Sequence, residues 1–319
     1  MFAYGMMAIL TSLLCLIIIK LPGIISYIGT IIWGAGLIIC ASHLKSWQYL
    51  SILLLNVVLF LILAASNELF IYLSFFGISA MAMSCLASFD MNYYFIQKIG
   101  AVSVILGVSL FLWFLLLTNG TLGIKDMEIS LSSYMEQSFA VYEAEGLTDI
   151  YEQAGIPPEV IKEYLTKTAQ NVARHLPAFY YLQALTSAFV MLLLATYVIQ
   201  KYKIGNLRKE PFYKEILPWQ SVGAVILGLT FCLLDYTDKS ALFYTGSNIL
   251  AFMIPVAVYY GLAAFVYKTK QQLLNLKSLI IIVSVILTLT FPLLVVVFLA
   301  AIGIFDSLLD YRKIQDTDI

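Results

Sequence analysis

The chain has 319 residues, of which 61% are apolar and only 12% are charged, and its formal net charge is −1. A soluble domain carries about twice this share of charged residues, so the composition excludes an ordinary soluble domain. The four cysteines all lie in apolar segments, and none has the spacing of metal ligands. We therefore interpret them as packing residues rather than as a metal site.

Apolar segments of about 20 residues, the length that crosses a bilayer core, recur along the chain. They predict an all-α, polytopic membrane bundle of about eight to ten transmembrane helices. The first five spans are expected at residues 2–19, 24–42, 48–66, 70–88 and 101–117. The first has no basic region before it and no small-residue cleavage site after it, which favours a retained helix over a signal peptide. Residues 1–118 are thus predicted to form an N-terminal membrane bundle.

The segment at residues 119–178 is the only long stretch suited to water. We expect helices at 127–142 and 149–153, and a third opened by Pro157 and Pro158 with Glu159 in its first turn. Val160, Tyr164, Thr168 and Val172 give this third helix an i, i+4 stripe. Acidic residues outnumber basic ones in this segment. Two interpretations remain open: a solvated helical cap on the membrane surface, or a lid or docking surface for a partner.

The remaining sequence, residues 179–319, returns to membrane-spanning lengths. Spans are expected at 179–199, 221–234 and 243–267. The apolar run at 279–305 is long and is interrupted by Pro292. It forms either one long kinked helix, which would place the C-terminus outside the cell, or a hairpin of two short helices, which would return the C-terminus to the cytoplasm.

Charge in the loops predicts the orientation of the chain. The loop at 200–219 is the most basic one and is short enough for the positive-inside rule to apply. We therefore expect this loop and the N-terminus to be cytoplasmic, and residues 119–178 to be extracytoplasmic.

Polar residues within the predicted spans are candidates for a ligand site. Asn56 lies in the middle of a span, where an amide must find a partner. Gln183 and Thr186 form a polar stripe. Asn248 and Tyr260 lie in a span that Pro255 and Gly261 interrupt, and such a helix can kink and line a cavity. The alternative for each is plain helix packing: interhelical hydrogen bonds for Asn56, and a polar cap with a proline kink for the others.

The C-terminal motif comprises Gly303, Asp306, Asp310 and Arg312. Asp306 and Asp310 are four residues apart, so their charges repel modestly on a helix. They either end an amphipathic helix at the interface, or form a carboxylate site that docks a partner or couples to a cation. Asp306 paired with Arg312 of a returning segment is one form of the second interpretation. No catalytic, metal or cofactor motif is present, so we do not expect an enzyme, a metal site or a cofactor.

The second half of the chain, about residues 170–313, resembles the YybS-like family of bacterial predicted membrane proteins, a domain of unknown function. The resemblance rests on residues 175–179, on a basic loop with Pro211-Phe212 and Pro218-Trp219, on residues 246–248 and 260–261, and most specifically on the C-terminal motif. It implies a bacterial cytoplasmic (inner) membrane location. It also implies a fold similar to the substrate-binding membrane subunits of energy-coupling-factor transporters.

This resemblance implies the binding or transport of a small molecule. The alternative from another class is a non-catalytic membrane scaffold or assembly factor that binds a partner protein. The expected contacts are therefore the lipid bilayer, a small-molecule substrate or a membrane protein partner, and no nucleic acid.

Overall fold

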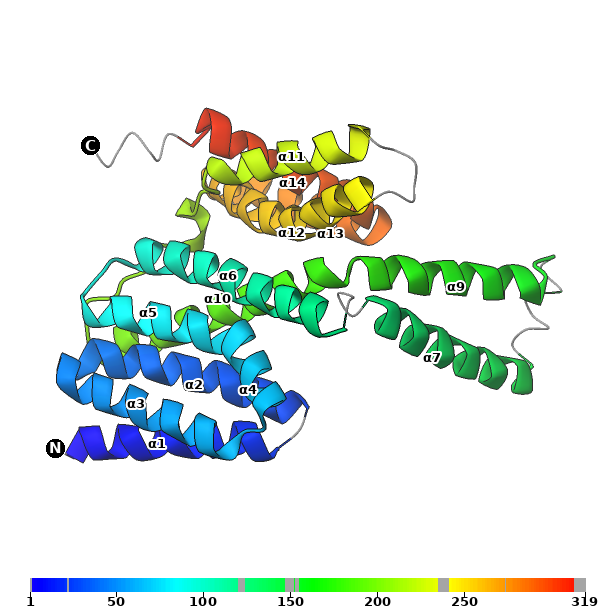
Figure 1. Ribbon diagram of the computed structural model, residues 1–319. Helices are drawn as coiled ribbons and strands as arrows, with labels where there is room; N and C mark the ends of the chain where they lie inside the picture. Colours follow the sequence, from blue (N-terminus) through cyan, green and yellow to red (C-terminus); the bar gives the residue numbers. More distant parts are fainter. Residues whose placement is uncertain are drawn as a thin grey trace. The chain divides into compact units, whose positions relative to one another are not determined.

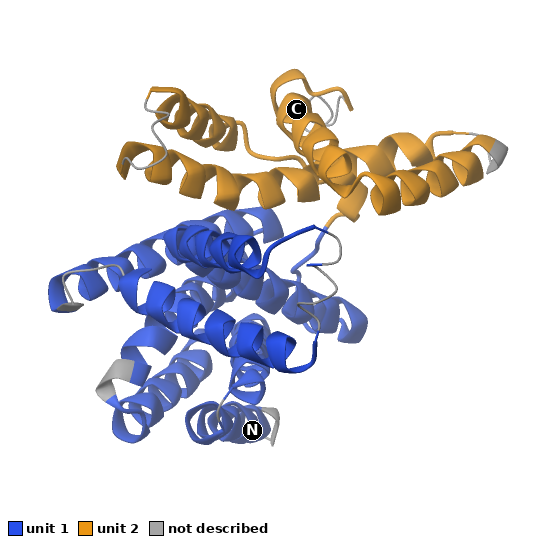
Figure 2. Ribbon diagram, turned by 90° about the vertical axis from the view of Figure 1, so that its right-hand side faces the viewer, with its two compact units in different colours: residues 1–209 blue, residues 210–319 orange. Residues whose placement is uncertain are grey.

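The computed structural model describes residues 2–21, 23–119, 124–146, 152, 155–234, 241–272 and 274–312. These residues form two compact units, residues 1–209 and 210–319, which are shown in blue and orange in Figure 2. Every regular element within the described ranges is helical. The expected helix at 149–153 falls outside the described ranges, apart from Glu152.

Unit 1 is a bundle of long apolar helices (Figure 1). Its elements are α1 (Phe2–Lys20), α2 (Ile24–His43), α3 (Ser46–Leu63), α4 (Ser66–Tyr72), the π-helical turn η1 (Leu73–Gly77), α5 (Ile78–Ser88), α6 (Tyr93–Asn119), α7 (Ile124–Ala144), α9 (Pro158–Arg174) and α10 (Leu176–Tyr202). α10, which the sequence assigns to the C-terminal part, packs on α2 and α6 within unit 1.

Unit 2 contains the remaining elements. They are the short 3-10 turn η2 (Phe212–Lys214), α11 (Gln220–Leu234), α12 (Ala241–Lys270), α13 (Leu274–Thr290) and α14 (Pro292–Leu309). α12 is the central helix, because α11 and α14 both pack on it.

Seven of the described helices are long and apolar enough to cross a membrane, and three shorter apolar helices accompany them. This confirms the predicted all-α polytopic membrane bundle. The predicted bounds differ most at α6, which begins at Tyr93 rather than at residue 101. The Asn92 side chain accepts a hydrogen bond from the Phe95 N–H at 2.7 Å. It thus caps a helix end that hydropathy alone would place later.

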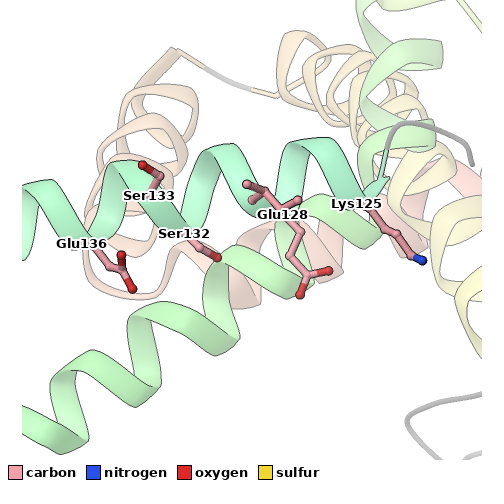
Figure 3. A pocket seen from close by; sticks show the side chains of 6 residues that line it. Lys125, Glu128, Ser132, Ser133 and Glu136 are labelled. Carbon is pink, nitrogen blue, oxygen red and sulfur yellow. The ribbon is translucent and has the colours of Figure 1, made fainter. Parts of the chain in front are cut away.

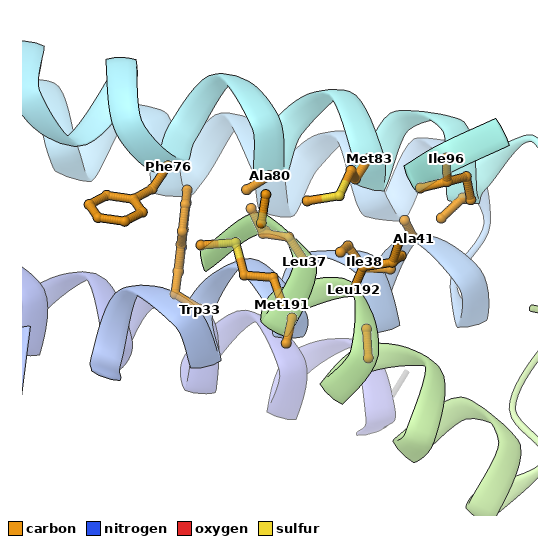
Figure 4. Close-up of a cluster of buried hydrophobic side chains, with 14 of the residues drawn as sticks. Trp33, Leu37, Ile38, Ala41, Phe76, Ala80, Met83, Ile96, Met191 and Leu192 are labelled. Carbon is orange, nitrogen blue, oxygen red and sulfur yellow. The ribbon is translucent and has the colours of Figure 1, made fainter. Parts of the chain in front are cut away.

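The core of unit 1 is built around α2, which packs on α1, α5 and α10. Trp33, Leu37 and Ile38 of α2 lie against Met83 of α5 and Met191 of α10 in Figure 4. All five side chains are at most 4% exposed. Close packing of this kind holds helices together in a membrane. Lipid tails are as apolar as the helix surfaces, so the hydrophobic effect cannot drive the helices to associate there.

Hydrogen bonds between tyrosine and serine side chains join neighbouring helices of unit 1. The oxygen pairs are Tyr4–Ser51 at 2.8 Å, Ser26–Tyr72 at 2.6 Å, Tyr27–Ser187 at 2.8 Å, Tyr49–Ser84 at 2.6 Å and Ser109–Tyr181 at 2.7 Å. Each bond satisfies a hydroxyl that would otherwise face hydrocarbon. Together they fix the rotation of most helices in this bundle.

α7 and α9 form an antiparallel pair, here called the α7–α9 hairpin. In Figure 1 the two helices continue away from α6 and α10 and pack side by side. α7 has no fully buried residue, and α9 buries only Ala169 and Ala173. The two helices of the hairpin therefore bury far fewer side chains than the helices of the core around α2 do.

The final apolar run forms two helices rather than one. The chain breaks at Phe291, Pro292 begins α14, and α13 packs on α14. The Tyr267 hydroxyl, near the end of α12, lies 3.5 Å from the Arg312 carbonyl oxygen. The last described residue therefore returns to the end of α12 at which the basic Lys268 and Lys270 lie, as a hairpin requires.

Candidate functional site

Asn56 is fully buried on α3 and is surrounded by partners from three helices. Its oxygen accepts hydrogen bonds from the Cys15 thiol at 2.8 Å and from the Trp33 indole N–H at 3.0 Å. Its NH₂ group donates to the Thr11 hydroxyl at 3.2 Å and to the Ile52 carbonyl oxygen at 2.8 Å. These bonds use all of its donors and lone pairs. In this structure the amide acts as an interhelical hydrogen-bond centre.

The polar stripe on α10 does not join Asn56. Gln183 and Thr186 are exposed, whereas the neighbouring Ser187 is buried and bonds to Tyr27 and to the Gln183 carbonyl oxygen. Asn56 is enclosed by its own partners on α1, α2 and α3. The structure therefore keeps Gln183 and Thr186 on the exposed surface of α10 and does not bring Asn56 to them.

Asn248 and Tyr260 lie on α12 in unit 2. The Asn248 side chain donates to the Tyr244 carbonyl oxygen one turn earlier, at 2.8 Å. The Tyr260 ring packs edge-on against Tyr259, with ring centroids 5.2 Å apart. The two residues are three turns apart on the helix, so they do not meet at one point.

The C-terminal motif forms a buried ion pair. α14 ends at Leu309, and Asp310 adopts the left-handed conformation, with a φ of 40°. This turn folds the chain back, as left-handed residues do after helix ends. The Arg312 guanidinium then contacts the Asp306 carboxylate through Nη2 at 2.6 Å and through Nε at 3.0 Å. Asp306 is 2% exposed and Arg312 is 4% exposed.

Arg312 also binds the loop before α11. It donates to the Tyr213 carbonyl oxygen at 2.5 Å and to the Glu215 carbonyl oxygen at 2.6 Å. The Glu215 carboxylate, itself 2% exposed, accepts a hydrogen bond from the Tyr259 hydroxyl at 2.7 Å. We call Glu215, Tyr259, Asp306 and Arg312 the arginine cluster. It ties α12, α14 and the 210–219 loop to one another.

Two glycines allow α12 and α14 to approach closely beside the arginine cluster. A Cβ atom on Gly261 would overlap the Leu299 carbonyl oxygen, and one on Gly303 would overlap the Ala257 carbonyl oxygen. The backbones therefore touch at this crossing, as small residues permit in membrane bundles. Asp306 lies one turn beyond Gly303, so the crossing sets its position.

Asp306 lies in the last turn of α14, and its carboxylate is buried against Arg312 rather than exposed. The carboxylate is buried because Arg312 neutralises it, and a lone buried charge would be far more costly. Sequence reasoning did not single out Glu215, Tyr259 or Tyr213. Tyr213 and Glu215 lie between the Pro211-Phe212 and Pro218-Trp219 pairs of the family resemblance, and Tyr259 directly precedes the candidate residue Tyr260.

Two hollows at the described residues differ in size and enclosure. One, of about 550 Å³, lies along α7 and is open to the surroundings (Figure 3). It is lined by Lys125, Glu128, Ile129, Ser132, Ser133 and Glu136. The other, beside Ser42 and Asn206, has a volume of only about 10 Å³, which is room for a single water at most. In the part of the chain that the structure describes, no group of three or more His, Cys, Asp or Glu side chains is placed to hold a metal ion.

The α7–α9 hairpin exposes large apolar side chains beside its packed seam. Tyr134 and Val141 on α7 are 68% and 53% exposed, and Val160 and Tyr164 on α9 are 53% and 71% exposed. We call these four residues the tyrosine face. The predicted stripe on α9 is therefore mostly exposed at Val160, Tyr164 and Val172, while Ile161, Leu165 and Ala169 face the partner helix.

Helix geometry places all four residues of the tyrosine face on one side of the hairpin. Tyr134 directly precedes the half-buried Met135, and Tyr164 directly precedes the half-buried Leu165. In an antiparallel pair of right-handed helices, residues that precede the packed positions point to the same side of the pair. Val141 follows Tyr134 by two turns and Val160 precedes Tyr164 by one turn, so both share that side.

Comparison with known protein families matches residues 9–307 to the family described as "Predicted membrane protein (DUF2232)". The chain belongs to this family. The match is consistent with the YybS-like resemblance, and it extends the similarity beyond residues 170–313 to nearly all of the N-terminal spans. It ends just after Asp306 and leaves out Asp310 and Arg312. Comparison with curated proteins and with solved structures found no match.

Membership of this family, together with the apolar helices, shows that the chain is a multi-pass membrane protein. The family description states no activity. Any function must therefore be argued from the arginine cluster, the buried amide and the α7–α9 hairpin themselves.

Proposed function

We propose that this membrane protein is a non-catalytic scaffold that binds a partner protein through the α7–α9 hairpin. The observation that carries the proposal is the tyrosine face, four large exposed apolar side chains on a segment that also carries many charges. Exposed aromatic residues beside a packed seam are typical of protein interfaces. By the charge of the loops, the hairpin is extracytoplasmic, so the partner would contact the protein on that side of the membrane.

The buried polar residues support a scaffold better than a ligand pocket. Asn56 has its hydrogen bonds satisfied by Cys15, Trp33, Thr11 and Ile52. Gln183 and Thr186 on α10 are exposed, and on α12 the Asn248 side chain donates to the Tyr244 carbonyl oxygen of the same helix. The larger hollow lies along the hairpin rather than within the bundle.

Affinity purification of the tagged full-length protein, after cross-linking in intact cells, tests this proposal. We expect one partner in stoichiometric amount, and we expect a variant that replaces residues 124–174 with a flexible linker to lose it. Purification of the protein alone, at native expression and with efficient cross-linking, would contradict the scaffold.

Small-molecule binding or transport, of the energy-coupling-factor substrate-subunit type, is the second candidate. It is favoured by the arginine cluster, because buried charged residues in membrane bundles are often part of substrate or ion pathways. A bound ligand raises thermal stability by mass action. A thermal-shift screen of the purified protein against vitamins, amino acids and metal ions tests it, and the absence of any shift across such a panel would count against transport.

A further inference from the structure

The end of unit 1 that lies away from the α7–α9 hairpin is strongly basic. Residues 43–47, 89–98 and 200–209 hold six lysine and arginine residues but a single acidic residue, Asp90. We call the six the basic rim: Lys45, Lys98, Lys201, Lys203, Arg208 and Lys209. Lys209 is half-buried, and the other five are exposed.

The fold brings these three segments to one end of the bundle. The short connections from α2 to α3 and from α5 to α6 lie at the same end as the last turn of α10 (Figure 1). A Cβ atom on Gly205 would lie 3.2 Å from the Ser42 carbonyl oxygen, so the chain after α10 crosses the end of α2. Asn206 and Asp90 line the same small hollow. The charges of the basic rim therefore surround five helix ends of unit 1.

Most of the positive charge of the basic rim is not neutralised by the protein. In the part of the chain that the structure describes, five of its residues form no ion pair: Lys45, Lys98, Lys201, Lys203 and Arg208. The Lys201 ammonium lies 5.6 Å from the ring centroid of Tyr197 and 5.8 Å from that of Tyr202. Such contacts orient a cation but leave its charge in place. The rim can therefore attract an anionic ligand.

Exposed aromatic side chains accompany the basic rim. Trp47, two residues after Lys45, is 79% exposed, and Tyr202, directly after Lys201, is 64% exposed. Tryptophan and tyrosine concentrate at the headgroup level of a bilayer, and lysine side chains near the ends of membrane helices extend to that level. Basic and aromatic residues together at the ends of apolar helices favour a lipid headgroup over the anionic surface of a soluble protein or a nucleic acid.

We infer that the basic rim binds the headgroups of anionic phospholipids in the surrounding bilayer. The lysine and arginine side chains would contact the phosphate groups, and the exposed rings would lie against the upper part of the acyl chains. Clusters of four to eight basic residues beside membrane helices attract anionic lipids in this way. The attraction is electrostatic, so it weakens as salt shortens the Debye length. This inference does not depend on the proposed scaffold function.

Tryptophan quenching by brominated lipids tests the inference directly. The full-length protein is placed in nanodiscs of phosphatidylcholine and phosphatidylglycerol, with bromine on the acyl chains of one lipid at a time. The variant Trp113→Phe and Trp219→Phe reports on Trp47, because the remaining Trp33 is buried. We expect phosphatidylglycerol to be enriched about fivefold beside Trp47, the effect of one basic residue near an anionic surface. The enrichment should vanish at about 1 M salt, where the Debye length is about 3 Å. Equal quenching by both lipids at low salt would overturn the inference.

Trp113 provides a matched control on the same bundle. It is 61% exposed on α6 and lies about 30 Å beyond Tyr93 along the helix, away from the basic rim. The variant Trp47→Phe and Trp219→Phe reports on Trp113, again with Trp33 buried. The two lipids should quench Trp113 equally. An equal preference for phosphatidylglycerol at both positions would show that the basic rim is not its cause, which would overturn the assignment.

Charge variants locate the site among exposed side chains, so the fold is not disturbed. Lys45→Gln, Lys203→Gln and Arg208→Gln, combined in the Trp47 reporter, should abolish the preference for phosphatidylglycerol. The control removes three exposed lysines elsewhere in unit 1, by Lys20→Gln, Lys125→Gln and Lys162→Gln, and should keep it. The thermal unfolding midpoints of both variants should match that of the reporter. A preference that persists in the first variant, or disappears in the second, would overturn the assignment to the basic rim.

A competition arm separates a lipid headgroup from a free phosphate compound. Inorganic phosphate or soluble glycerophosphoglycerol is added to the same nanodiscs, with sodium chloride at matched ionic strength as the control. Lipid headgroups are held beside the protein at high effective concentration, so the preference at Trp47 should be the same in all three solutions. Its loss with either phosphate compound, but not with sodium chloride, would show that the basic rim takes a soluble phosphate and would overturn the lipid assignment.

Discussion

Within the arginine cluster, the surroundings of Asp306 follow from its neighbours in the fold and not from its position in the sequence. Asp306 at the end of an apolar run is compatible with an interface residue, where a carboxylate costs little. In the structure, Arg312 folds back over six residues to neutralise it and also satisfies two backbone carbonyl oxygens of the 210–219 loop. Removal of either charge would leave the other buried and uncompensated.

We expect Asp306→Asn and Arg312→Gln each to destabilise unit 2 by about 3–5 kcal/mol, the usual cost of breaking one side of a buried ion pair. The double variant should be less destabilised than the sum of the two, because neither charge is then left alone. Unfolding of the purified protein in detergent, followed by intrinsic fluorescence, measures all three.

Asp310→Asn is the control for this prediction. Asp310 adopts a positive φ, and asparagine tolerates that conformation as well as aspartate does. We therefore expect it to change stability by less than about 1 kcal/mol. Equal and silent behaviour of the Asp306 and Asp310 variants would show that the ion pair does not hold unit 2 together.

At the scale of elements, the crossing of α12 and α14 depends on the absence of two side chains. At Gly261 and Gly303 a methyl group would overlap backbone carbonyl oxygens of the facing helix, and backbone atoms cannot move aside as a flexible side chain can. The crossing also positions Asp306 one turn later. Helix packing and the arginine cluster are therefore coupled in unit 2.

Gly303→Ala should force the two helices apart and destabilise unit 2 by about 2–3 kcal/mol, as overpacking does in well-packed interiors. The thermal unfolding midpoint in detergent should fall accordingly. A Cβ atom added to Gly223 on α11 would meet no other atom within 4 Å. Gly223→Ala should therefore be neutral or slightly stabilising, because alanine favours the helix. A similar loss in both variants would indicate that the crossing is not the cause.

At the scale of the whole molecule, the charge of the loops predicts how the chain crosses the membrane. In a variant without the four native cysteines, Ser133→Cys on α7 should react with a membrane-impermeant maleimide in intact cells. Asn206→Cys in the basic loop should react only after permeabilisation. Both positions are exposed, so access to the reagent depends on the side of the membrane. Labelling of both from the same side would contradict the topology.

The end of the chain provides a second comparison within unit 2. Because α13 and α14 form a hairpin, Tyr311→Cys should label from the same side as Gln271→Cys in the loop after α12. Both residues are exposed in the structure. Labelling from opposite sides would restore the alternative of one long terminal helix.

The sequence by itself determined the membrane class, the helical fold, most of the spans and a water-suited central segment. These properties depend on local composition: a run of about 20 apolar residues crosses a bilayer wherever its neighbours lie, and an acidic stretch with turn residues does not. Helix ends were less certain, as at α6, because a cap such as Asn92 shifts them by whole turns. Asn56 was correctly singled out as a buried amide, but its partners on α1 and α2 could not be named.

Only the tertiary structure decided what the polar residues do. Arg312 and the Glu215 carbonyl oxygen are 97 residues apart along the chain, and no spacing rule connects them. The tyrosine face depends on which stripe of α9 packs on α7. Hydropathy cannot choose between two adjacent apolar stripes, and the contact between the two helices leaves one of them exposed.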